Sequence, residues 1–216
     1  MVAVSDKLRR HFGNLAIYLF DQILRGRFDA VQSILDVGCG SGRNLAYFLR
    51  EGFEVWGLDR DAQAVAASRN LAQQISPNFS VAQLRIAEAD AIPFPQSSFD
   101  AVICSAVLHF ANDQEHFHRM LDTMWNVLSE GGLFFARLAS TIGMEEHLQL
   151  LQGRHYQLPG GTTWFLVDEG ILLECTNRLG GTLLDPIKTT NVQNKRCMTT
   201  WCLMKNSEPP TATSSA

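Results

Sequence analysis

The chain has 216 residues, of which 46% are hydrophobic, so it is long enough to bury one large core and nothing in its length asks for two domains. With a formal net charge of -4 it lacks the broad basic surface that supplies most nonspecific affinity for nucleic acids, which disfavours a nucleic-acid partner and favours a small substrate. Its five cysteines contain no CxxC pair and no secretory leader precedes them, so we expect a cytoplasmic protein with neither a disulfide framework nor a bound metal.

The first 30 residues have a helical pattern. Apolar residues recur there at spacings of three and four, at positions Leu8, Phe12, Leu15, Leu19 and Ile23. The pair Gly13-Asn14 predicts a break between two helical segments. The apolar run at 16–20 is too short to span a membrane, so we expect it in the protein core. We interpret 1–30 as an N-terminal helical cap that precedes the first strand.

Short apolar runs and amphipathic segments alternate over 33–138. The predicted strands cover 33–38, 54–58, 81–87, 99–105 and 133–138. Predicted helices cover 42–51 and 61–75, and a third ends at Gly131-Gly132. The third helix has an apolar stripe made of Phe117, Met120, Leu121, Met124 and Leu128. This alternation predicts a doubly wound α/β domain, with a parallel sheet covered on both faces and right-handed crossovers.

The periodicity fades over 139–166, where turn signals are mixed with aromatic residues, and we interpret this segment as a lid that faces a substrate. Asp168 is suited to cap a helix that runs to 179. Residues 182–191 and 196–204 predict a strand pair, and Pro186 places the first of them at a sheet edge. The single domain thus covers 1–206. The tail at 207–216 is predicted to be disordered because it has almost nothing to bury.

A glycine-rich turn, "DVGCGSG", follows the first predicted strand. In a doubly wound sheet, a bare backbone at this point brings N–H groups close to a nucleotide at the carboxyl ends of the strands. The dinucleotide fingerprint needs a glycine at position 43, where this chain has Arg43, and no Walker lysine follows. The turn therefore predicts a nucleotide-like ligand, with a weakened case for a pyrophosphate.

The stretch "LDVGCGSG" resembles the first motif of class I S-adenosylmethionine-dependent methyltransferases. The stretches "GLDRD", "AEADAIPFP" and "FDAVICSAVLHF" fall where that family has its later motifs. The resemblance covers 33–138 and implies a Rossmann-like, seven-stranded sheet whose last strand is antiparallel. It also implies an enzyme that uses S-adenosyl-L-methionine for methyl transfer by in-line displacement. Two further stretches, "GSGRN" and "GFEVWGLD", are similar to the tellurite-resistance and thiopurine-type branch, which acts on small molecules.

The resemblance implies a set of cofactor-binding residues. Asp59 would bind both ribose hydroxyls, because a carboxylate accepts two hydrogen bonds. Asp90 and Ala91 match the adenine-binding loop, and the loop carbonyls near Ser105 would receive the methionine ammonium. The full set is Asp36, Gly38, Gly40, Gly42, Asp59, Arg60, Asp90, Ala91 and Ser105. Arg43 either neutralises the cofactor carboxylate or lies in solvent, and the sequence leaves both open.

His109 is the candidate catalytic residue. It follows the fourth strand, where several methyltransferases place groups that contact the substrate, and imidazole takes a proton near neutral pH. The alternative is that His109 packs or caps. Arg137, Tyr156 and Trp164 are candidate substrate residues that suit an anionic or aromatic acceptor. Methyl transfer from a sulfonium mostly needs a nucleophile held in a dry pocket, so a missing acid–base pair is no objection.

Three other functions stay open. The acceptor would be a protein or RNA in one of them, and in another the chain would be a noncatalytic partner that binds S-adenosylmethionine. The chain has "CSAVLHF" in place of the Asn/Asp-Pro-Pro-Tyr/Phe/Trp motif of base-nitrogen methyltransferases, which disfavours nucleic-acid bases. A nucleotide-sugar or NAD-dependent oxidoreductase shares the fold but should carry the missing glycine and a Tyr-x-x-x-Lys pair. We therefore expect a small-molecule methyltransferase.

Overall fold

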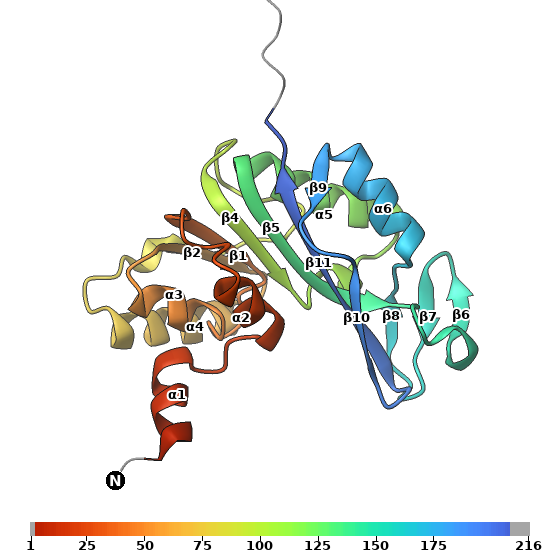
Figure 1. Ribbon diagram of the computed structural model, residues 1–216, viewed down its shortest axis with the longest axis horizontal. Helices are drawn as coiled ribbons and strands as arrows, with labels where there is room; N and C mark the ends of the chain where they lie inside the picture. Colours follow the sequence, from red (N-terminus) through yellow and green to blue (C-terminus); the bar gives the residue numbers. More distant parts are fainter. Residues whose placement is uncertain (1–2, 208–216) are drawn as a thin grey trace, which may run out of the picture.

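A mixed β-sheet forms the centre of the molecule (Figure 1) in the computed structural model, which describes residues 3–207. The strand order is β10-β11-β5-β4-β1-β2-β3, and β9 pairs with the edge of β11 that also pairs with β10. The strands are β1 (Ser33–Val37), β2 (Glu54–Asp59), β3 (Leu84–Ile86), β4 (Phe99–Ser105), β5 (Leu128–Ser140), β9 (Gly181–Leu183), β10 (Lys188–Val192) and β11 (Arg196–Lys205). Strands β1 to β5 pair in parallel, whereas β11 is antiparallel to β5. The predicted Rossmann-like sheet with an antiparallel last strand is confirmed, and β9 is an additional short strand.

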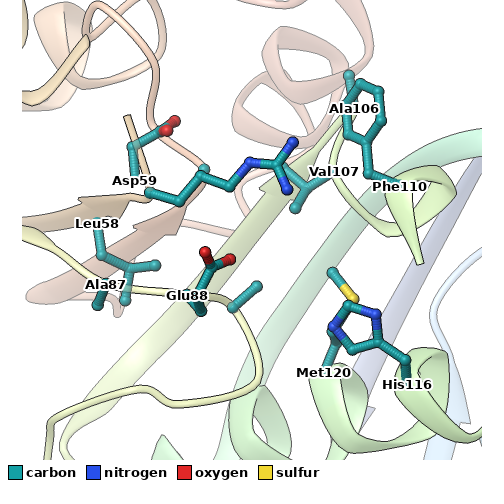
Figure 2. A pocket seen from close by; sticks show the side chains of 12 residues that line it. Leu58, Asp59, Ala87, Glu88, Ala106, Val107, Phe110, His116 and Met120 are labelled. Atoms are coloured by element: carbon teal, nitrogen blue, oxygen red, sulfur yellow. The ribbon is translucent and has the colours of Figure 1, made fainter. Parts of the chain in front are cut away.

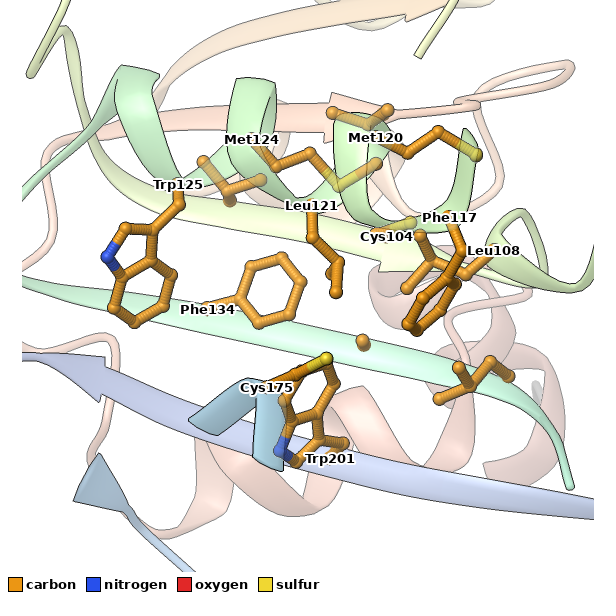
Figure 3. Close-up of a cluster of buried hydrophobic side chains, with 14 of the residues drawn as sticks. Cys104, Leu108, Phe117, Met120, Leu121, Met124, Trp125, Phe134, Cys175 and Trp201 are labelled. Carbon is orange, nitrogen blue, oxygen red and sulfur yellow. The ribbon is translucent and has the colours of Figure 1, made fainter. Parts of the chain in front are cut away.

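Helices cover both faces of this sheet (Figure 1). They are α2 (Ile17–Leu24), α3 (Leu45–Arg50) and α4 (Ala62–Ile75) on one face, and α5 (Gln114–Val127) and α6 (Glu169–Arg178) on the other. Successive strand residues point to opposite faces, so Phe134 packs with α5 and Phe135 packs on the α2–α4 side. The predicted stripe of α5 is buried in the core at Phe117, Met120, Leu121 and Met124 (Figure 3). None of the helices within residues 3–207 is long and apolar enough to cross a membrane.

The N-terminal segment forms two helices, and the predicted break between them is confirmed. Helix α1 (Val4–Phe12) ends where Gly13 adopts a φ of 62°, and α2 begins four residues later. Helix α1 has no buried residue and lies against α3, where the Phe12 ring stacks on Tyr47 at 5.5 Å. Helix α2 buries Leu19 completely in the hydrophobic core. Only the second helix is therefore part of the core.

Several of the predicted elements have other limits in the structure. Helix α3 begins at Leu45 and not at 42, because Gly42 adopts a φ of 86° that no α-helix has. Over 81–87, only β3 is a strand, and it follows the 3₁₀ helix η1 (Val81–Gln83). Helix α5 ends at Val127 and β5 follows directly, so Leu128 and Gly131-Gly132 belong to the strand. A Cβ on Gly132 would lie 2.7 Å from Ser129 O and 3.0 Å from the Asp100 carbonyl of β4, so backbone on two sides leaves no space for a side chain.

The expected lid loop is a second, smaller sheet. After the 3₁₀ helix η3 (Glu145–His147), strands β6 (Gln149–Gln152), β7 (His155–Gln157) and β8 (Thr163–Phe165) pair antiparallel. Asp168 caps α6 as predicted, with its carboxylate accepting a hydrogen bond from Ile171 N at 2.8 Å. The predicted strand 182–191 is interrupted between β9 and β10, and Pro186 lies in the interruption because it has no N–H to donate. The predicted disordered tail, 207–216, lies outside the described residues apart from Ser207.

Candidate functional site

The glycine turn after β1 is held against the end of β2. Gly38, Gly40 and Gly42 have φ angles of 72°, 55° and 86°, a region that favours glycine. A Cβ on Gly38 would clash with Val107 Cγ2, so glycine is needed there for space as well. The N–H groups of Gly38 and Cys39 donate to Leu58 O at 2.8 and 2.9 Å. The turn therefore has one fixed position next to the end of β2.

A cavity of about 160 Å³ opens beside this turn, beyond the carboxyl ends of β1 to β4. We call it the Asp59 cavity. Its lining residues are Gly38, Leu58, Asp59, Arg60, Ala87, Glu88, Ala89, Ala106, Val107, Phe110, His116 and Met120. Figure 2 shows Asp59 and Glu88 on one side of the cavity, with Phe110 and His116 on the other. The cavity thus combines apolar walls with two carboxylates, which suits a ligand that has a flat ring and several hydrogen-bond donors.

Asp59 lies at the end of β2, and its carboxylate faces both the glycine turn and the cavity. Oδ2 accepts a hydrogen bond from Gly40 N at 2.9 Å, and Oδ1 accepts one from Asp61 N at 2.9 Å. A carboxylate has about four lone-pair sites, so Asp59 keeps acceptor capacity for two hydroxyl groups of a ligand. The guanidinium of Arg60 lies 6.0 Å from the centre of the Phe110 ring, across the mouth of the same cavity.

Asp90 and Ala91 are not among the residues that line the Asp59 cavity. The Asp90 carboxylate lies 3.4 Å from His116 Nε2 and 3.9 Å from Arg119 Nε, so it contacts one residue that lines the cavity, His116. The residues that do line the cavity after β3 are Ala87, Glu88 and Ala89. The position of the strand end would have indicated these residues in the sequence. Because β3 ends at Ile86, Glu88 is the first acidic residue beyond it.

A group of buried polar side chains lies beside the glycine turn, on the α2–α3 face of the sheet. Among the described residues, neither carboxylate oxygen of Asp36 nor the Ser105 hydroxyl has a hydrogen-bond partner. Asp36 is only 1% exposed, and this burial raises the pKa of its carboxyl to about 7 although Arg43 and Asn44 oppose the shift. A buried carboxyl without a partner fits a cationic ligand group, because the cation would supply the missing interaction.

Strand register places a row of polar residues across this face. Ser105 of β4 lies next to Arg137 of β5, Arg137 lies next to Thr200 of β11, and Thr200 lies next to Lys188 of β10. We call these four residues the polar row. Among the described residues, Arg137 Nε and Thr200 Oγ1 are buried without a partner. The Arg137 guanidinium lies 5.1 Å from the centre of the Tyr18 ring on α2.

His109 lies in the 3₁₀ helix η2 (Leu108–Phe110), directly after β4. Its ring is buried and packs on Trp164 at a centroid distance of 4.5 Å. Burial, and next the charge of Arg137, lower the pKa of His109 to about 4. The imidazole is therefore neutral at pH 7 and is a weak base.

The structure brings two of the three candidate substrate residues together, and the third makes a different contact. Tyr156 and Trp164 face each other across β7 and β8, and both pack near the ends of β5 and β11. Trp164 contacts His109, whereas Arg137 contacts Tyr18 of α2. Tyr18 is not among the predicted substrate residues, because α2 and β5 are brought together only by the fold.

Residues 35–136 match the family model of the methyltransferase domain. The 18S rRNA (guanine(1575)-N(7))-methyltransferase of Saccharomyces cerevisiae is 30% identical over 113 residues, which make up 48% of this chain and 39% of that protein. The ubiquinone biosynthesis O-methyltransferase of Serratia proteamaculans is 32% identical over 139 residues, which make up 60% of this chain and 55% of that protein. The chain thus matches 39% and 55% of the length of these two curated relatives.

The fold is similar to that of the 1,6-didemethyltoxoflavin-N1-methyltransferase of Burkholderia thailandensis, solved with 1,6-didemethyltoxoflavin and S-adenosylhomocysteine. The TM-score is 0.66 at 18% identity, over 94% of this chain and 87% of that chain. The segment 35–136 contains the glycine turn, Asp59, Glu88 and Ser105. Residues 35–136 therefore match a methyltransferase domain, as the sequence motifs predict.

Proposed function

We propose that this chain is an S-adenosylmethionine-dependent methyltransferase that acts on a small molecule. The observation that carries the proposal is the Asp59 cavity, which lies beside the unpartnered carboxyl of Asp36. A nucleoside that carries a cationic amino-acid group needs a cavity for the nucleoside and, beside it, a carboxylate for the cation. A location in the cytoplasm and membership of the tellurite-resistance and thiopurine-type branch remain predictions from the sequence.

The residues of the cavity fit the parts of this cofactor. Asp59 would bind the ribose hydroxyls, and the backbone at Gly38, Gly40 and Gly42 would lie along the chain that joins ribose to methionine. We assign the adenine to Glu88 and Ala89, with Asp90 and Ala91 behind them and Arg60 at the mouth. Asp36 and the backbone near Ser105 would hold the methionine ammonium, because the oxygens of the buried carboxyl accept no hydrogen bond from the described residues.

When bound, the cofactor supplies a methyl group already activated by a sulfonium. The chain must then hold the acceptor in line, exclude water and, where needed, remove a proton. A pKa of about 4 leaves His109 a weak base at neutral pH. We therefore assign His109 to the wall of the acceptor site, together with Trp164, and expect an acceptor that ionises readily without a strong base.

Two other functions share the cofactor. The relative from Saccharomyces cerevisiae is described as an rRNA methyltransferase, which makes RNA the second candidate acceptor. The net charge of -4 argues against it, since binding RNA needs cations that neutralise phosphates. A noncatalytic partner protein would bind the cofactor equally well but would show no turnover.

The test is product mass after incubation of the purified chain with isotope-labelled S-adenosylmethionine. The acceptor panel contains thiols, phenols, carboxylates and amines, with total RNA and denatured protein as separate arms. Label in a small molecule supports the proposal, and Asp59→Ala, tested alongside, should lower its yield. Label found only in RNA or protein, or tight cofactor binding with no labelled product in any arm, contradicts it.

A further inference from the structure

A second cavity of about 350 Å³ lies between α2 and the strands β10 and β11. We call it the α2–β10 pocket. Its lining includes Tyr18 and Gln22 from α2, Lys188 at the start of β10 with the preceding Ile187, and Thr200 from β11. It has no lining residue in common with the Asp59 cavity. The α2–β10 pocket is therefore separate from the proposed nucleoside site.

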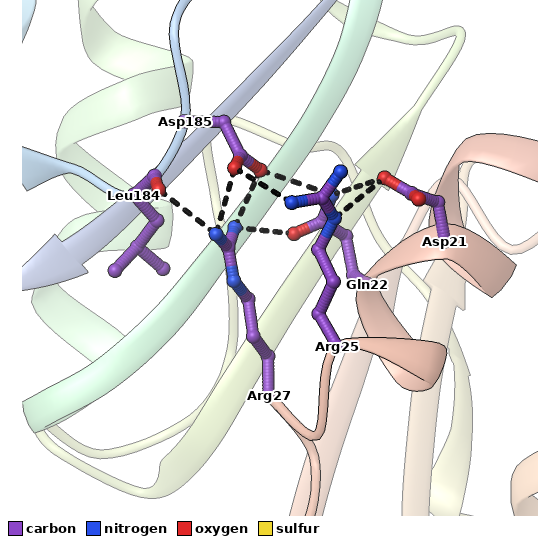
Figure 4. A network of polar contacts seen from close by, with 6 residues as sticks. All are labelled: Asp21, Gln22, Arg25, Arg27, Leu184 and Asp185. Atoms are coloured by element: carbon purple, nitrogen blue, oxygen red, sulfur yellow. Dashed lines mark hydrogen bonds and ion pairs between the residues drawn. The ribbon is translucent and has the colours of Figure 1, made fainter.

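The acidic groups at the rim of this pocket are already neutralised. Arg27 donates to both carboxylate oxygens of Asp185, at 2.6 and 2.8 Å, and also to Leu184 O (Figure 4). Arg25 donates to the Asp21 carboxylate at 3.0 Å. Because these carboxylates are bound by arginines, they are poor sites for a cationic ligand.

Two cations beside the pocket are not neutralised by a carboxylate. Among the described residues, Arg137 and Lys188 form no ion pair with any carboxylate. Both lie over the Tyr18 ring, with Arg137 Cζ at 5.1 Å and Lys188 Nζ at 5.2 Å from its centre. An aromatic face attracts a cation but does not neutralise it. Arg137 is also partly buried and lies near the positive charges of Arg43 and Arg196, so an anion at this point would remove an electrostatic cost.

The polar row connects these cations to the proposed methyl-transfer site. Arg137 is one strand away from Ser105, and Lys188 is three strands away. With a spacing of about 4.8 Å between strands, Lys188 lies roughly 14 Å from Ser105 across the sheet. A small molecule spans this distance, so one end can lie near the methyl group while the other end contacts the cations.

We propose that the methyl acceptor carries a carboxylate or a similar anionic group, which binds to Arg137 and Lys188 over the Tyr18 ring at the α2–β10 pocket. The reacting atom then points along the polar row toward Ser105. This proposal rests on the proposed function. The cofactor's own carboxylate is the other possible source of the anion, and the exposed Arg43 at the glycine turn is the residue that we expect to bind that group.

The test uses aromatic carboxylates and their neutral amides as matched probes. Benzoate, 4-hydroxybenzoate and salicylate are compared with the corresponding amides by ligand-observed NMR titration, with and without S-adenosylhomocysteine. The wild-type chain should bind the carboxylates about tenfold or more tightly, as expected for a charge-assisted contact. The preference should vanish in Arg137→Met and in the exposed Lys188→Met. It should persist in Arg25→Met, which removes a rim cation already paired with Asp21.

Three results would decide whether this proposal, the cofactor's own carboxylate or the proposed function is at fault. Equal binding of acids and amides by the wild-type chain overturns the proposal. So does a loss of S-adenosylhomocysteine affinity in Arg137→Met when 5′-methylthioadenosine, which has no carboxylate, binds unchanged. If S-adenosylhomocysteine does not bind the wild-type chain, the proposed function fails, and the arm without S-adenosylhomocysteine still decides whether the pocket prefers anions.

Discussion

Asp36 and Asp59 lie at the ends of the neighbouring strands β1 and β2, and their two carboxyls differ in hydrogen bonding. Asp59 is bound by two backbone N–H groups, whereas no hydrogen bond reaches either carboxylate oxygen of Asp36 among the described residues. Burial raises the pKa of Asp36 from 3.8 to about 7. Because the folded pKa lies above the unfolded one, this carboxyl favours the folded state fully below pH 3.8 and loses that contribution as the pH rises through 7.

The raised pKa predicts that cofactor binding depends on pH. A cationic ammonium next to Asp36 binds best when the carboxylate is ionised, so S-adenosylhomocysteine should bind roughly fivefold more weakly at pH 6 than at pH 7. Calorimetric titrations at the two pH values check this. Asp36→Asn keeps the size and removes the charge, so its affinity should be lower at pH 7 and nearly independent of pH. An equal pH dependence in both chains would assign the effect to another group.

Asp59 predicts a loss of binding without a loss of fold. Asp59→Ala removes the proposed acceptor for the ribose hydroxyls and should weaken S-adenosylhomocysteine binding by about 1.5 to 3 kcal/mol. The matched control is Asp61→Ala, which removes the cap of α4 but lies outside the Asp59 cavity. It should cost about 1 kcal/mol of stability and leave the affinity unchanged. An unchanged dissociation constant in Asp59→Ala would move the ribose site elsewhere.

The turn after α2 is fixed to the connection between β9 and β10 by the Arg27–Asp185 contact (Figure 4). The two side chains are 17% and 24% exposed, and Arg27 makes several hydrogen bonds there. Arg27→Met should therefore lower the free energy of unfolding by about 2 to 4 kcal/mol in urea denaturation. Arg25→Met is the control, since Arg25 is 50% exposed and should cost less than about 1 kcal/mol. Equal losses in the two variants would show that the contact contributes no more than a surface pair.

The two N-terminal helices should respond differently to the cofactor. Tyr18 and Leu19 place α2 over the polar row and in the core, whereas α1 packs on α3 and buries no residue. Hydrogen exchange with S-adenosylhomocysteine should therefore show gained protection in Ile17–Leu24 and little in Val4–Phe12, with α6 as the unaffected control. Protection gained in α1 alone would mean that the first helix, and not α2, closes over the site. We propose the β6–β8 sheet as the other cover, so it should gain protection with α2.

Much of the whole molecule could be predicted from the sequence, because buried parallel strands appear as continuous apolar runs between amphipathic helices. The small sheet β6–β8 could not be predicted, because all residues of β6 are exposed and β6 has no alternation of apolar and polar residues. Asp90 and Ala91 are the predicted adenine-binding pair, and we propose Glu88 and Ala89 instead because β3 ends at Ile86 and these two residues line the Asp59 cavity. Of the polar row, the sequence indicated Ser105 and Arg137 but neither Thr200 nor Lys188. Its members lie on four strands far apart in the sequence, and only the register brings them together.

The central claim is that the Asp59 cavity binds S-adenosylmethionine. The most direct measurement is a calorimetric titration of the purified chain with S-adenosylmethionine and S-adenosylhomocysteine, with NAD as the matched nucleotide. The structure and the glycine spacing predict binding of both sulfur compounds, weakened in Asp59→Ala, and no binding of NAD. Tight binding of NAD together with no heat from either sulfur compound would contradict the account, because the glycine turn and Asp59 would then serve a dinucleotide.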